Sequence, residues 1–255
     1  MSYIQFDPRT LPFFPTQLII SLIMWYFVYQ VFRKKKEREE KGLPVEFVQT
    51  LLVTFIAMAS TITMICAGFA SAVILGYFGE FYRFTLPAGY VLLLLSNVLL
   101  YNFSLELFSL DKKRIWLLIA FIIPVGILIL LPCNYYGISV EHYDVATSCR
   151  FYSNVALLVL SLVLYLEIVV NAFKISRKTS EAIPKYSFKF FGFGVLFLIF
   201  FLAMLAADAL MLDMGHEGYT FFLYIGYSSL LGFFVFAYWA LLMPPWLKEK
   251  LMENS

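Results

Sequence analysis

The chain has 255 residues, of which 62% are hydrophobic and only 14% are charged, and its mean hydropathy is +0.82. Soluble domains are roughly 45–50% apolar and about 25% charged, so this composition excludes a soluble globular domain, a disordered chain and a collagen-like chain. A membrane span needs roughly 20 mostly apolar residues. Seven spans would leave only short loops, with no room for an extramembrane catalytic or nucleic-acid-binding domain.

Seven apolar runs long enough to cross a bilayer follow one another along the chain. We expect the first helix to begin at Thr16, just after Pro15. The second run is longer than a bilayer requires, so its helix should tilt or project into the cytoplasm. The expected fold is an all-α membrane protein, a single seven-transmembrane helix bundle over residues 1–255. Its spans occupy residues 11–32, 46–77, 84–108, 114–132, 151–173, 187–211 and 219–243.

The basic residues lie almost entirely on one side of this arrangement. The loops and tail on that side contain 16 of the 19 lysines and arginines, whereas the other side has only Arg9, Arg83 and Arg150. Because basic loops stay in the cytoplasm, we expect the N-terminus outside and the C-terminus in the cytoplasm. The expected location is the plasma (cytoplasmic) membrane, and no cleavable signal peptide is recognisable.

The three cysteines have different settings. Cys66 lies inside the second run and is expected to be a buried, inert thiol. Cys133 and Cys149 bracket the longest outer loop, and a disulfide between them would stabilise the fold by up to roughly 3 kcal/mol through chain entropy. The alternative is two free thiols at helix ends. The loop itself could cover the mouth of the bundle or simply connect two spans.

Three acidic residues interrupt the apolar runs, at Glu106, Glu167 and Asp208. With a rise of 1.5 Å per residue, both glutamates fall toward the cytoplasmic side and Asp208 falls near the outer face. Ionisable residues inside spans usually face the bundle interior. An asparagine lies four residues from each glutamate and therefore on the same helix face. We predict an inner polar cluster that joins the third and fifth helices, made of Asn102, Glu106, Glu167 and Asn171.

Each cluster has an alternative interpretation. The inner cluster could act as a proton-sensitive latch, or each glutamate could reach its own interfacial base, such as Lys112, Arg114 or Lys174. Asp208 could polarise an outward-opening pocket or simply be hydrated at the end of its helix. The candidate ligand-pocket residues are Asn97, Asn154, Asp208 and Tyr227.

Small residues mark expected helix contacts, because they let helix backbones approach closely. The second run has small residues at a spacing of four, and the last run has two more. They predict close packing rather than a ligand motif. These residues are Ala59, Thr63, Ala67, Ser71, Ser228 and Gly232.

The sequence lacks the residues that several kinds of cofactor and catalytic site require. Both histidines, His142 and His216, lie in expected outer loops, which argues against intramembrane haem or zinc. The last span has no lysine for a retinal Schiff base, so the chain is not expected to be a retinal-binding rhodopsin. Phosphate-binding and nucleophile motifs do not occur. We expect no enzymatic activity, no metal and no cofactor.

The end of the last span carries a resemblance. Residues 238–248 read Tyr-Trp-Ala-Leu-Leu-Met-Pro-Pro-Trp-Leu-Lys. This segment, together with the seven-helix topology, resembles prokaryotic seven-helix sensor regions. In these, the seventh helix leaves the membrane through a proline-containing, basic-aromatic segment into a signalling domain. The resemblance implies a sensory region, here expected to have no output domain of its own. The amphipathic stub around Trp246 and Leu247 is expected on the inner membrane surface.

The expected function is that of a receptor-like or sensory seven-helix membrane protein. It would act through a cytoplasmic or membrane protein partner, in contact with membrane lipids and without nucleic acid. The alternatives are a small-solute or lipid transporter or channel, and a structural subunit of a membrane complex. A transporter should have a polar path through the membrane, and between its inner and outer polar residues this sequence offers little besides Asn97, Ser161 and small hydroxyls.

Overall fold

The computed structural model describes residues 11–131, 150–213 and 220–253. These residues form eight helices, and six of them are long and apolar enough to cross a membrane. The chain is therefore an α-helical, multi-pass membrane protein. The helices are α1 (Phe13–Glu40), α2 (Glu46–Leu75), α3 (Glu80–Leu107), α4 (Arg114–Leu130), α5 (Arg150–Lys178), α6 (Ala182–Asp213), α7 (Phe221–Leu242) and α8 (Pro245–Glu253).

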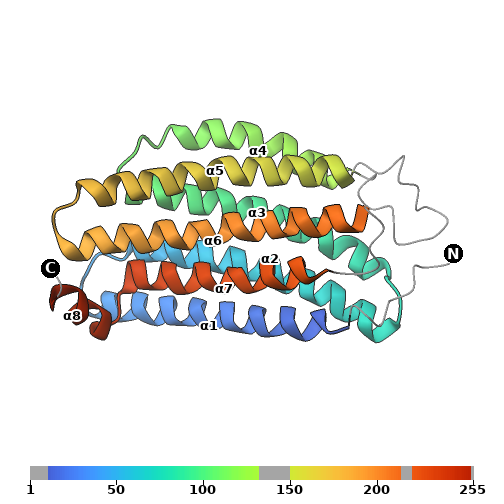
Figure 1. Cartoon of the computed structure of the whole chain (residues 1–255), viewed down its shortest axis with the longest axis horizontal. Helices are drawn as coiled ribbons and strands as arrows, with labels where there is room; N and C mark the ends of the chain where they lie inside the picture. The colour runs from blue at the N-terminus through green and yellow to red at the C-terminus, as the bar shows by residue number, and fades with distance from the viewer. Residues whose placement is uncertain (1–10, 132–149, 214–219, 254–255) are drawn as a thin grey trace.

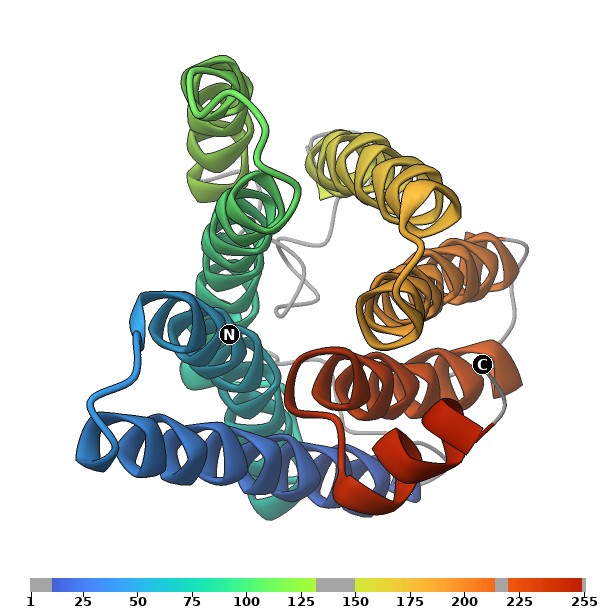
Figure 2. The ribbon, with the colours of Figure 1, turned by 90° about the vertical axis from the view of Figure 1, so that its left-hand side faces the viewer.

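The first seven helices lie side by side, and α8 follows at the end where α7 finishes (Figure 1). Seen along the bundle, α1, α2, α3, α5, α6 and α7 surround its interior, and α4 lies at the edge against α3 and α5 (Figure 2). We call the end where α1 begins the N-terminal end, and the end that carries α8 the C-terminal end.

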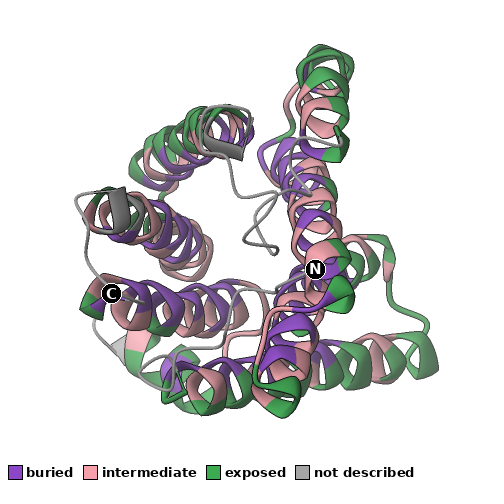
Figure 3. Ribbon diagram, turned by 90° about the vertical axis from the view of Figure 1, so that its right-hand side faces the viewer, coloured by how far each residue is buried: buried purple, intermediate pink, exposed green. Residues whose placement is uncertain are grey.

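The buried residues lie on the inward-facing sides of the helices that surround the interior, whereas much of the outer surface is exposed (Figure 3). Large apolar side chains are prominent among the exposed residues, including Trp116, Phe121, Leu210 and Phe221. A water-facing surface would not carry so many exposed apolar side chains, so this outer face suits contact with lipid chains.

Several helices continue beyond the apolar runs that predicted them. α1 extends past residue 32 to Glu40, where ion pairs one helical turn apart, Arg33–Glu37 and Lys35–Glu39, support it. The predicted start at Thr16 is wrong, because α1 begins at Phe13. A proline in the first turn breaks no helical hydrogen bond, so Pro15 is accommodated inside the helix. Apolar runs mark the width of the membrane, not the length of the helix.

The fourth helix differs from the rest. α4 has 17 residues, so it is about 26 Å long, a little less than the roughly 30 Å hydrocarbon core of a bilayer. It continues through Pro124, and only Leu118 and Ile129 are buried. Six long apolar helices and one short apolar helix therefore stand where the sequence predicted seven spans.

Glycines allow the closest helix contacts. A Cβ atom added to Gly232 of α7 would lie 2.6 Å from the ring of Phe197 in α6. One added to Gly68 of α2 would collide with the side chain of Thr85 in α3. The close packing expected at Gly232 is present between α7 and α6, and Gly68 allows a similar contact between α2 and α3, whereas Ser228 is exposed.

Candidate ligand cavity

A cavity of about 350 Å³ lies inside the bundle near its N-terminal end. Six helices line it, with Phe13 from the first turn of α1, Tyr82 from the start of α3 and Leu223 from the first turn of α7. Most of the wall is apolar. Ligand pockets of this size are typically apolar with a few polar groups that orient the ligand.

Three polar side chains of this wall are almost completely buried, and one of them, Thr61, donates its hydroxyl to the carbonyl of Ala57 in its own helix at 3.0 Å. Gln17 of α1 is 1% exposed, and its Oε1 atom has no hydrogen-bond partner among the described residues. Asp208 of α6 is 4% exposed, and its Oδ1 atom accepts hydrogen bonds from the backbone N–H of Thr220 at 2.8 Å and from the Thr220 hydroxyl at 2.6 Å. These two bonds tie α6 to the start of α7.

Three of the four predicted pocket residues line this cavity together, namely Asn154, Asp208 and Tyr227. The ring of Tyr227 makes edge contacts with Phe13 and Phe201, at centroid distances of 5.0 Å and 5.6 Å. The aromatic ring contacts fix the orientation of the Tyr227 side chain in the wall.

Asn97 lies elsewhere, in a buried contact between α3 and α5. Its Nδ2 atom donates to the Ser161 hydroxyl at 2.8 Å, and its Oδ1 atom accepts from the Tyr165 hydroxyl at 2.6 Å. All three side chains are buried, and Asn97 is not among the residues that line the cavity. Its polar atoms are already occupied, so Asn97 stabilises the helix pair and does not face a ligand.

Gln17 was missed by sequence reasoning. It is a lone amide one turn inside the first apolar run, and neither its spacing nor a neighbouring motif distinguishes it. Only the fold shows that α1 brings this amide to the same cavity wall as Asp208, in contact with the Tyr227 side chain.

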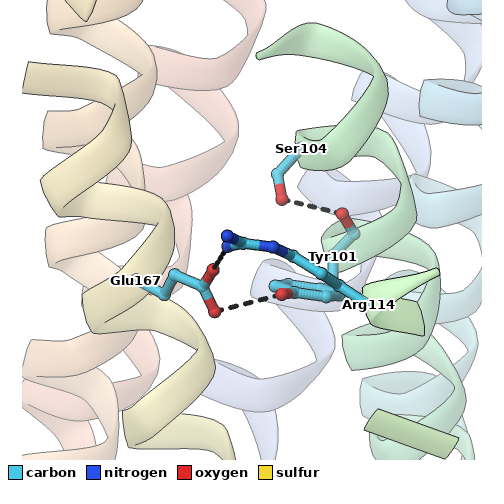
Figure 4. Close-up of polar contacts among 4 residues, drawn as sticks. All are labelled: Tyr101, Ser104, Arg114 and Glu167. Atoms are coloured by element: carbon cyan, nitrogen blue, oxygen red, sulfur yellow. Dashed lines mark hydrogen bonds and ion pairs between the residues drawn. The ribbon is translucent and has the colours of Figure 1, made fainter. Parts of the chain in front are cut away.

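The predicted inner cluster separates into two independent contacts. Glu106 pairs with Lys112 at 3.1 Å. Glu167 accepts from Arg114 at 2.8 Å and from the Tyr101 hydroxyl at 3.0 Å (Figure 4). The short turn between α3 and α4 brings both bases back beside the glutamates.

Each glutamate thus has its own base, as in the alternative interpretation. Asn102 and Asn171 take no part in these contacts, and no hydrogen bond or ion pair joins Glu106 to Glu167 in the described part of the chain. The four residues do not share one polar pocket. Half-exposed pairs of this kind contribute little to stability individually.

The cysteines divide between the described and undescribed residues. Cys66 is a buried free thiol in α2, as expected. The predicted partners of the disulfide, Cys133 and Cys149, lie outside the described residues.

The fold and cavity define an α-helical, multi-pass membrane protein with a ligand-sized, mainly apolar internal cavity. No protein-family model, curated protein or solved structure matches this chain. Its function is therefore inferred from the cavity and the polar contacts themselves.

Proposed function

We propose that this chain is a seven-helix membrane receptor or sensor that binds a small, mainly apolar ligand inside the bundle and acts through a partner protein. The cavity of about 350 Å³ carries the proposal, because its size and its mainly apolar wall suit such a ligand. Apolar cavities in proteins bind small apolar molecules when these are supplied.

The proposed topology makes α4 the seventh span, with the N-terminus outside. Its 17 residues are at the lower limit for a crossing helix, and it exposes apolar side chains such as Leu117 and Phe121. With α4 across the membrane, the basic segments of the helix ends all fall on the C-terminal side of the bundle. That asymmetry is the one the positive-inside rule requires of a cytoplasmic face.

The packing between the cavity and the C-terminal end favours a receptor over a transporter or channel. Fully buried phenylalanines fill this region, with ring centroids 4.6 Å apart for Phe55 and Phe234 and 5.6 Å apart for Phe103 and Phe191. A solute crossing the bundle would need a polar path at this level. The aromatic layer supports a ligand that binds and leaves by the same side.

A partner at the C-terminal end has a surface available. A groove of about 470 Å³ lies between α2 and the turn after α3, and its lining includes the charged side chains of Glu46, Glu106 and Lys112. Charged and apolar side chains line this groove in similar measure, whereas the cavity wall is mainly apolar, so the groove suits a protein surface better than a lipophilic ligand.

Cavity binding can be tested with a matched pair of leucine variants on α6. Leu205 lines the cavity, whereas Leu210 is 62% exposed on the outer face of the same helix. We expect pentylbenzene to raise the unfolding temperature of the wild-type protein and of Leu210→Trp, but not of Leu205→Trp, where the indole occupies the cavity. An equal shift in all three proteins would place the probe outside the cavity and defeat the proposal.

Topology can be tested by labelling single cysteines from each side of sealed membranes, with the native cysteines replaced. Gly42 follows α1, and Gly76 follows α2. We expect Gly42→Cys and Lys112→Cys to react from inside, and Gly76→Cys and Ser148→Cys to react from outside. If Lys112→Cys and Ser148→Cys reacted from the same side, α4 would not cross the membrane.

A further inference from the structure

The carboxylate of Asp208 is an unusual group for the wall of an apolar cavity. It is 4% exposed, and neither lysine, arginine nor histidine forms an ion pair with it among the described residues. Arg83, a basic residue near the same end of the bundle, pairs instead with Glu80 at 3.1 Å. A buried charge is costly unless it is paired.

The two oxygens of the Asp208 carboxylate have different surroundings. Two donors of Thr220 converge on Oδ1, and hydrogen bonds to an ionised acceptor are the stronger kind. Thr220 also caps the start of α7, where the helix dipole attracts negative charge. The second carboxylate oxygen, Oδ2, takes part in no hydrogen bond within the described residues.

A second unpaired acceptor lies on the same wall. The Oε1 atom of Gln17 has no partner among the described residues, although the side chain is 99% buried. Both unpaired atoms accept hydrogen bonds, so a complementary ligand must donate them. Acceptor-only groups, such as the carboxylate of a fatty acid or a ketone, would meet two further acceptors and be disfavoured.

An ammonium group answers both requirements, because it carries only donors and its charge compensates a carboxylate. A neutral hydroxyl could donate one hydrogen bond but would bring no positive charge to the carboxylate of Asp208. We propose that the ligand of this cavity is a lipophilic amine, whose ammonium group binds Asp208 and Gln17 and whose apolar body contacts the aromatic and aliphatic wall. This proposal rests on the proposed function, since it assumes that the cavity is a ligand site.

Three probes of similar shape separate charge from apolar contact. They are 4-phenylbutylamine, 4-phenylbutan-1-ol and pentylbenzene, tested by titration on the full chain in nanodiscs of neutral phosphatidylcholine. A primary amine is charged near pH 7, as lysine is. We expect the amine to bind the wild-type protein at least about tenfold more tightly than either neutral probe, in line with close charge pairs measured elsewhere.

The test variant is Asp208→Asn, which removes the charge while its amide oxygen can still accept both hydrogen bonds from Thr220. It should reduce amine affinity to that of the alcohol and leave pentylbenzene binding unchanged. The control, Glu167→Gln, neutralises a carboxylate at the other end of the bundle and should preserve the preference for the amine.

The outcomes distinguish this inference from the proposed function. If pentylbenzene binds the wild-type protein but the amine binds no better, the cavity is a ligand site and the amine proposal is wrong. If the preference for the amine survives Asp208→Asn, the ammonium group is bound elsewhere and the proposal is also wrong. If none of the three probes binds, the proposed function itself fails. If Asp208→Asn does not fold, the affinities of the three probes for the wild-type protein still test the preference for the amine.

Discussion

The two ends of the bundle use the same chemical groups in different ways. At the C-terminal end, the carboxylate of Glu167 has both an arginine and a tyrosine as partners. At the N-terminal end, the carboxylate of Asp208 is more deeply buried, yet only the neutral donors of Thr220 reach it in the described structure. An acidic residue in an apolar helix therefore does not by itself indicate a binding site. Whether its charge is already compensated is the more informative property.

The two ends of the bundle also differ in how densely their side chains pack. The central and C-terminal parts are filled by phenylalanine rings that contact one another, such as Phe55 with Phe234. The N-terminal part leaves a cavity between six helices. A filled core contributes stability, whereas an unfilled one forgoes some of it, so the cavity is where the fold gives up packing density.

The largest effect is expected where the packing is closest. Gly232→Ala should destabilise the protein by about 1–3 kcal/mol, because the new methyl group overlaps the Phe197 ring. Thermal unfolding in detergent measures this change. The control is Gly126→Ala in α4, where the nearest atom would be 3.7 Å away; its stability should stay the same or rise. Equal losses in both variants would contradict the contrast between the dense core and the edge.

Replacing a buried polar residue should cost more stability when its side-chain atoms are hydrogen-bonded than when they are not. Asn97→Leu should cost about 1–3 kcal/mol, because the buried hydroxyl of Tyr165 loses its acceptor. Gln17→Leu should cost less, under about 1 kcal/mol, because the contact of its amide with the Tyr227 hydroxyl is lost but so is an Oε1 atom that has no partner among the described residues. Chemical or thermal unfolding of the two variants provides the comparison. A larger loss for Gln17→Leu would mean that its amide is structurally required.

The paired contacts at the C-terminal end can be separated by double-mutant cycles. Glu106→Gln and Glu167→Gln should be additive within about 0.5 kcal/mol, because the two carboxylates have different partners. Tyr101→Phe and Glu167→Gln should couple by more than about 0.5 kcal/mol, because these residues share a hydrogen bond. Coupling between the two glutamates would restore the shared pocket that the sequence suggested.

The smallest effect is expected in the turn that brings Lys112 and Arg114 into place. Ser109 has a φ of 52°, and the backbone N–H of Leu110 donates to the carbonyl of Leu105 at 2.9 Å, which is a left-handed helix end. Ser109→Gly should stabilise the protein by about 0.5–1 kcal/mol, since glycine adopts this conformation without strain. Ser109→Ala, measured in the same unfolding assay, should give no such gain.

Much of the fold could be predicted from composition and periodicity. Bilayer thickness imposes a minimum length on apolar runs, and this constraint located all seven helices of the bundle to within a few residues at their apolar cores. Helix ends such as Glu40 and Lys178 could not be located in this way, because charged residues continue a helix in water as readily as apolar ones do in lipid. The sequence also placed Asn154, Asp208 and Tyr227 as candidates that the fold then brought to one cavity.

The partners of the other polar residues could not be predicted, because they depend on distances between helices that the sequence does not give. Glu106 and Glu167 fall at similar depth along their helices, but depth does not specify which face each one presents or which base returns from the next turn. Asn97 looked available because a sequence does not show that Ser161 and Tyr165 meet it across the helix pair. Gln17 looked incidental because a sequence does not show that its Oε1 atom meets no hydrogen-bond partner among the described residues.

The length of α1 has a mechanical consequence. The helix contributes Phe13 and Gln17 to the cavity and continues without interruption to Glu40, so it is a single rod about 42 Å long. A tilt of about 5° around its cavity end would displace the far tip by about 4 Å. The cavity at one end of the bundle and the basic side chains at the other are therefore joined by one continuous helix. Under the proposed function, a change in ligand occupancy would reach the opposite face of the bundle through a tilt of this one helix.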